Sequence, residues 1–69
     1  MRRVVKVFII PTQRGPAAPP EPAPEFTVEA RTEDGLLDAA RTELASRGYR
    51  LRSLSFSPTG LVAYMEGHP

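Results

Sequence analysis

The sequence predicts an α+β fold, a two-layer β-β-α-β-β sandwich in which one helix packs on one face of a four-stranded sheet. Only residues 32–48 show a helical period, and four segments on either side are rich in β-branched and aromatic residues, as strands are. These segments are residues 3–10, 25–31, 49–57 and 61–66. A chain of 69 residues without cysteine fits one small domain with a thin core and no disulfides.

The first strand, residues 3–10, is apolar on both of its faces. Val5, Val7 and Ile9 alternate onto one face, whereas Val4, Phe8 and Ile10 share the other face with Lys6. A strand that is apolar on both sides is covered on both sides, which predicts a central place in the sheet.

Residues 11–25 hold six prolines in fifteen positions. Proline has no backbone N–H and disrupts both helices and central strands, so this segment is expected to be an extended Pro-rich loop. The pairs Pro16/Pro19 and Pro19/Pro22 fit a minimal PxxP ligand pattern. No basic residue stands at the flanking position that would orient such a ligand, so a plain tether is the favoured interpretation.

Residues 25–31 alternate between apolar and polar side chains, which predicts a half-buried strand near a sheet edge. The strand leads into the helix, whose buried stripe is expected at Leu37, Ala40 and Leu44, widened by Leu36 and Ala39. Thr32 is placed to cap the first turn, and Gly48 is placed to end the helix in a left-handed conformation.

Residues 49–57 and 61–66 are expected to form a hairpin around the turn Ser57-Pro58-Thr59-Gly60. The apolar alternation of the first of these strands changes phase near Ser53, which indicates either a bulge or burial of its two ends on opposite faces. A right-handed crossover through the helix makes the second and third strands parallel, and the first strand could lie between them.

One helix covers only one face of such a sheet. The expected helix-facing set is Val5, Val7, Ile9, Phe26, Val28, Ala30, Leu51, Ala63 and Met65. The seven apolar residues assigned to the opposite face are Val4, Phe8, Ile10, Leu54, Phe56, Val62 and Tyr64. An exposed apolar patch of this size is typical of an interface. The main hypothesis is therefore a protein-interaction module that forms a homodimer, or binds another protein, through this face.

A small RNA- or DNA-binding regulator is the alternative. Its candidate contacts are Arg2, Arg3, Lys6, Arg47, Arg50 and Arg52, with aromatic residues of the sheet as stacking platforms. The net charge is only +1, and residues 21–38 hold six acidic residues against one arginine. This acidic segment would repel phosphate groups, so protein contact is the favoured function.

No pattern of catalytic, metal-binding or cofactor-binding residues is present. The only histidine, His68, lies near the end of the chain, and the glycines lack the spacing of a phosphate-binding loop. We therefore expect no enzymatic activity, cofactor or metal. No apolar run is long enough for a membrane span, and no export signal is recognisable, which favours the cytoplasm. The Arg-, Ala- and Pro-rich composition hints at a GC-rich bacterial or phage source, and the strand–helix–strand pattern is too generic to assign a family.

Overall fold

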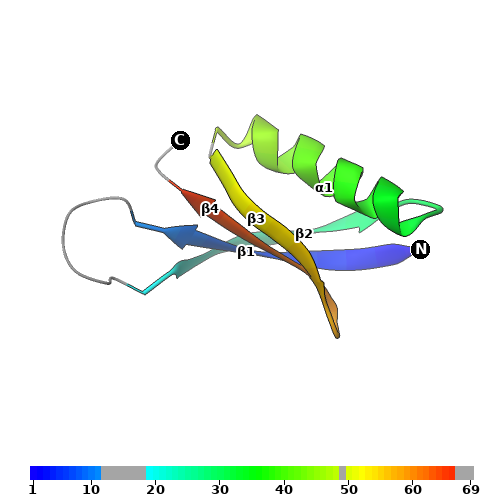
Figure 1. The fold of residues 1–69 in the computed structure, drawn as a ribbon, viewed down its shortest axis with the longest axis horizontal. Helices are drawn as coiled ribbons and strands as arrows, with labels where there is room; N and C mark the ends of the chain where they lie inside the picture. Colours follow the sequence, from blue (N-terminus) through cyan, green and yellow to red (C-terminus); the bar gives the residue numbers. More distant parts are fainter. Residues whose placement is uncertain (12–18, 49, 67–69) are drawn as a thin grey trace.

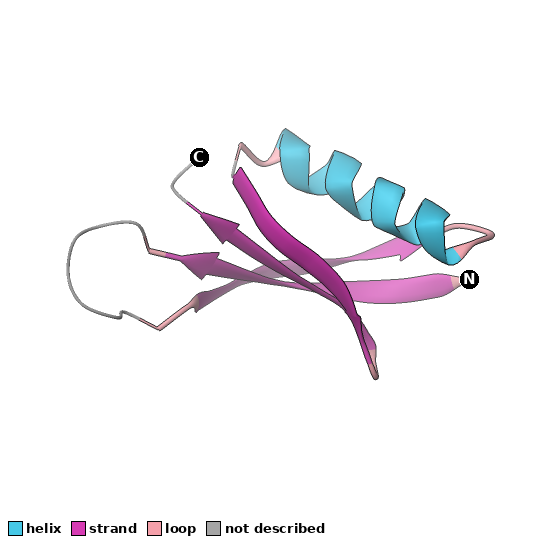
Figure 2. Ribbon diagram, viewed as in Figure 1, coloured by secondary structure: helices cyan, strands magenta, loops and turns pink. Residues whose placement is uncertain are grey.

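The computed structural model describes residues 1–11, 19–48 and 50–66, and it confirms the α+β architecture (Figures 1 and 2). A four-stranded sheet carries one helix on one of its faces. The elements are β1 (Arg2–Ile10), β2 (Glu21–Glu29), α1 (Glu33–Ser46), β3 (Arg50–Ser57) and β4 (Gly60–Glu66).

The strand order is β2-β1-β4-β3. The two central strands, β1 and β4, are parallel, and each pairs antiparallel with the edge strand beside it. The edge strands β2 and β3 consequently run in the same direction, as expected for a crossover through the helix. The first strand does lie between them, and β4 lies there as well. The central place predicted for β1 is confirmed, but the cover expected on both of its faces is not seen, because α1 lies on one face only among the described residues.

The core lies between the sheet and α1. Its nine buried residues are Val5, Val7, Val28, Leu36, Ala40, Leu44, Leu61, Ala63 and Met65. Four more of the residues expected on this face are half-buried against the core, namely Ile9, Phe26, Ala30 and Leu51. The expected helix stripe needs one correction, because Leu36 is only 1% exposed whereas Leu37 is half-buried. The buried stripe follows the i, i+4, i+8 spacing of Leu36, Ala40 and Leu44.

Both predicted ends of the helix are confirmed. The Thr32 hydroxyl accepts a hydrogen bond from the Gly35 N–H at 3.0 Å, which satisfies one of the unpaired donors of the first turn. At the other end Gly48 has a φ of 83°, and its N–H donates to the Ala45 carbonyl. A residue with a Cβ is strained in that left-handed conformation, so glycine suits the position after the helix.

The second strand begins earlier than the sequence indicates. The loop expected to reach Glu25 ends by Glu21, where β2 starts, and Pro22 and Pro24 lie within that strand. Prolines are tolerated there because β2 is an edge strand and its register with β1 shifts between Val5 and Val7. Residues 12–18 of the expected loop, including Pro16 of the first PxxP pair, lie outside the described residues.

The phase change in the third strand is a bulge, one of the two predicted explanations. Leu51 pairs with Met65 and Ser53 pairs with Tyr64, so β3 has one extra residue between these pairs. The bulge puts Leu51 and Leu54 on the same side of the sheet, where both pack against the core.

Gly60 joins the hairpin turn to the centre of the sheet, where it pairs with Val4 of β1. A Cβ at Gly60 would lie 2.4 Å from the Val4 carbonyl oxygen, so one strand would have to move. We predict that Gly60→Ala lowers the free energy of unfolding by about 1–3 kcal/mol in urea denaturation. Thr59→Ala, in the exposed turn, is the matched control and should change the free energy of unfolding by less than about 0.5 kcal/mol. Equal midpoints for the two variants would contradict the close approach of the strands.

Candidate interaction surface on the open face of the sheet

The face of the sheet opposite α1 is defined by the strand register. Directly paired residues lie on the same face, and Phe8 pairs with Tyr64, which pairs with Ser53. Lys6 and Val62 form the neighbouring row, which continues to Ser55. We call this surface the open face. Its middle belongs to β1 and β4, and its borders belong to β2 and β3.

An apolar stripe runs along the two central strands of the open face. It consists of Val4, Phe8, Ile10, Val62 and Tyr64, five of the seven residues that the sequence assigns to this face. Val4 is 39% exposed, and the other four are half-buried by their neighbours. The rings of Phe8 and Tyr64 stack with centroids 5.6 Å apart and an angle of 26° between their planes. This pair forms a flat aromatic centre, a common feature of protein interfaces.

Leu54 and Phe56 do not belong to the open face. Leu54 pairs with Ala63 and packs against the core, and Phe56 pairs with the buried Leu61. Both therefore lie on the helix side, so their predicted face was wrong. The prediction assumed that side chains alternate without interruption from Leu51 to Phe56. The bulge before Ser53 adds one residue, so Leu54 and Phe56 lie on the same face as Leu51. Phe56 is 43% exposed even so.

Polar groups surround the apolar stripe. An ion pair joins Arg2 to Glu29 at 3.6 Å on the β1–β2 side, and another joins Arg52 to Glu66 at 2.6 Å on the β3–β4 side. Both pairs are mainly solvent-exposed, so each adds at most about 1 kcal/mol to stability. The stripe is interrupted by Lys6, whose side chain is exposed. The open face is thus an apolar centre with charges of both signs at its margins.

The six basic residues proposed for nucleic-acid binding do not form one patch. Arg2 and Lys6 belong to the open face because they alternate with the core residues of β1. Arg50 belongs to it as well, because Arg50 and Ile10 both pair with Glu66 and Ile10 lies on the open face. Arg3 pairs with the buried Val28 and therefore belongs to the helix side. Three of the six are also engaged by carboxylates, namely Arg2, Arg47 and Arg52.

Arg47 has a structural role that the sequence did not reveal. Its guanidinium donates a 2.6 Å hydrogen bond to the Pro24 carbonyl and lies 4.7 Å from the centre of the Phe26 ring. It also forms an ion pair with Glu43 at 3.5 Å, and its side chain is only 21% exposed. Arg47 therefore binds the end of α1 to β2 through a charged hydrogen bond and a cation–π contact.

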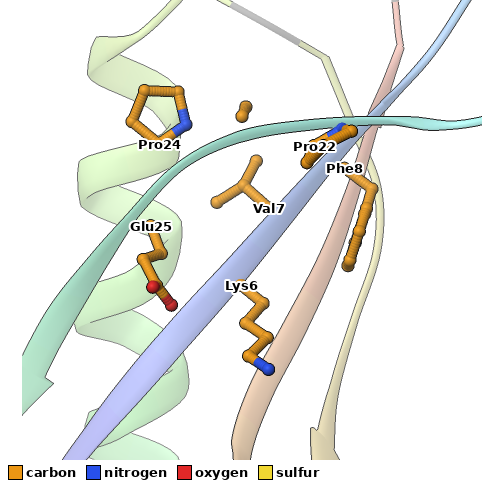
Figure 3. Close-up of a pocket in the computed structure, with 7 residues that line it drawn as sticks. Lys6, Val7, Phe8, Pro22, Pro24 and Glu25 are labelled. Atoms are coloured by element: carbon orange, nitrogen blue, oxygen red, sulfur yellow. The ribbon is translucent and has the colours of Figure 1, made fainter.

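A hollow of about 380 Å³ opens where β2 bulges away from β1 (Figure 3). Its walls are formed by Val7, Phe8, Pro22, Ala23 and Pro24, with Lys6 and Glu25 completing the lining. Phe8 and Pro22 lie close together in Figure 3, as expected from their pairing in the sheet. The walls are predominantly hydrocarbon, so the hollow can accept an apolar side chain next to the stripe.

The described residues contain no group of three or more His, Cys, Asp or Glu side chains that could hold a metal ion. Within the same part of the chain, α1 is too short and too polar to cross a membrane. Comparisons with protein-family models, with curated proteins and with solved structures found no match to this chain.

The role of Arg47 can be tested by truncation. Arg47→Ala removes a charged hydrogen bond and a cation–π contact, and we expect it to lower the free energy of unfolding by about 1–3 kcal/mol. Arg50→Ala is the control, because Arg50 is exposed at the start of β3, and it should change stability by less than about 0.5 kcal/mol. If both variants unfold at the same urea concentration as the wild type, Arg47 does not hold the helix to β2.

Proposed function

We propose that this protein is a small non-enzymatic protein-interaction module and that it forms a homodimer by packing two open faces together. The observation that carries the proposal is the stripe centred on Phe8 and Tyr64, which the only helix among the described residues leaves uncovered. Aromatic residues at the centre of a flat surface with polar margins are typical of protein-binding sites.

Burial of the stripe would supply useful free energy. Each square ångström of apolar surface removed from water contributes about 25 cal/mol, so covering five partly exposed side chains is worth a few kcal/mol. A domain of this size has a total stability of the same order. Association therefore compensates for a core that is limited to one side of the sheet.

The charges around the stripe suit a second copy of the same chain. Each side of the open face carries an arginine and a glutamate, Arg2 with Glu29 and Arg52 with Glu66. In a two-fold dimer, an arginine of one copy can therefore face a glutamate of the other copy in either relative orientation of the two open faces. Lys6 interrupts the stripe and opposes close packing there, and its long side chain can carry the ammonium group to the margin.

Sedimentation velocity at micromolar concentration tests the dimer. The wild type should sediment at twice the 7.6 kDa of one chain. Phe8→Asp places a charge at the aromatic centre and should raise the dissociation constant by about thirtyfold, the effect of losing one strong interface contact.

The matched control is Thr42→Asp, which adds the same charge on the exposed side of α1 and should leave the dissociation constant unchanged. Circular dichroism of both variants separates loss of association from loss of folding. A wild-type protein that sediments as a 7.6 kDa species over the whole concentration range would rule out the proposed dimer.

A further inference from the structure

The two edges of the sheet differ in their capacity to accept another strand. The β2 edge contains Pro22 and Pro24, which lack the N–H groups that a new strand would bind. The β3 edge contains no proline, and no other described strand pairs with its outer side. Its two arginines, Arg50 and Arg52, and its bulge lie in its first half. The second half, Ser53–Ser57, therefore has none of the features that discourage strand addition.

The sequence of this second half, Ser-Leu-Ser-Phe-Ser, has the same polar–apolar pattern in both directions around Ser55. By register the three serines lie on the open face, while Leu54 and Phe56 lie on the helix side. Leu54 is half-buried and Phe56 is 43% exposed, so apolar surface next to the core is still accessible along this edge. In Figure 1, β3 starts beside the end of α1 and runs away from the helix, so its second half lies apart from α1.

We propose that the β3 edge pairs antiparallel with the β3 edge of a second copy, with a two-fold axis through Ser55. In this register Leu54 lies opposite Phe56 of the second copy, and Ser53 lies opposite its Ser57. Every pair then joins residues of the same face, as antiparallel strands require. The exposed ring of Phe56 gains an apolar neighbour, and the unpaired backbone groups of both edges are satisfied.

Self-pairing fits this edge better than an unrelated extended peptide does. The five residues carry no charge, and the two-fold register sets Arg52 opposite Pro58 of the second copy, so the arginines do not meet one another. This two-fold axis is perpendicular to the sheet. Both helices therefore lie on the same side of the combined sheet, and the two open faces adjoin each other on its other side. This contact is separate from the face-to-face dimer, and the two are compatible in one assembly.

Single-cysteine variants test the edge contact, because the natural chain has no cysteine. Ser55→Cys places two thiols together at the axis, and under mild oxidation it should form a covalent dimer at least about tenfold faster than a thiol outside the contact. Thr27→Cys is the matched control, since Thr27 is also exposed and lies on the open face of the opposite edge strand. Both variants are made in the Phe8→Asp background, so the result does not depend on the face-to-face dimer.

A second cross-linking experiment fixes the register. A mixture of Ser53→Cys and Ser57→Cys should form the mixed disulfide, whereas either variant alone should cross-link slowly. Phe56→Glu added to Ser55→Cys should slow dimer formation by about tenfold, because it replaces the apolar contact with Leu54 of the second copy by a charge. Equal cross-linking rates for Ser55→Cys and Thr27→Cys would overturn the proposal. Rapid cross-linking of Ser55→Cys would support it. This conclusion holds whether or not Phe8→Asp alone changes the sedimentation of the protein.

Discussion

The structure depends on the parallel pairing of β1 with β4 at the centre of the sheet. This pairing brings the two most apolar strands together and places Val5, Val7, Ala63 and Met65 side by side beneath α1. The same pairing gathers Phe8 and Tyr64 on the reverse side. Side chains alternate along a strand, so both central strands present apolar groups on both faces, and among the described residues α1 covers only one of these faces.

The helix is capped locally at its start and is fixed to the sheet at its end. Thr32 caps its start, and Arg47 binds Pro24 and Phe26 of β2 at its end. The helix contacts both edge strands as well as β1, so it lies across the sheet on one side only (Figure 1). The proposed functions on the open face and on the β3 edge follow from this arrangement, because these are the surfaces that the helix leaves accessible.

Local signals in the sequence were sufficient for the element order, the helix caps and the hairpin turn, and they left the bulge in β3 as one of two explanations. The errors have non-local causes. The sequence showed that the phase of β3 changes, yet the side on which Leu54 and Phe56 lie depends on their pairing with Ala63 and Leu61. Likewise, Pro22 and Pro24 fit into a strand only because β2 lies at an edge, which is a property of the strand order. Arg47 was grouped with the other arginines because its contacts with β2 join residues more than twenty positions apart.

The central claim is that the stripe on β1 and β4 is buried against a second molecule. Methyl NMR spectra recorded over a dilution series test it most directly, because Val4 and Val62 lie on the open face whereas Val5 and Val7 lie in the core. We predict that the Val4 and Val62 methyl signals shift on dilution, whereas those of Val5 and Val7 stay constant. Methyl signals of Val4 and Val62 that are independent of concentration would contradict the claim.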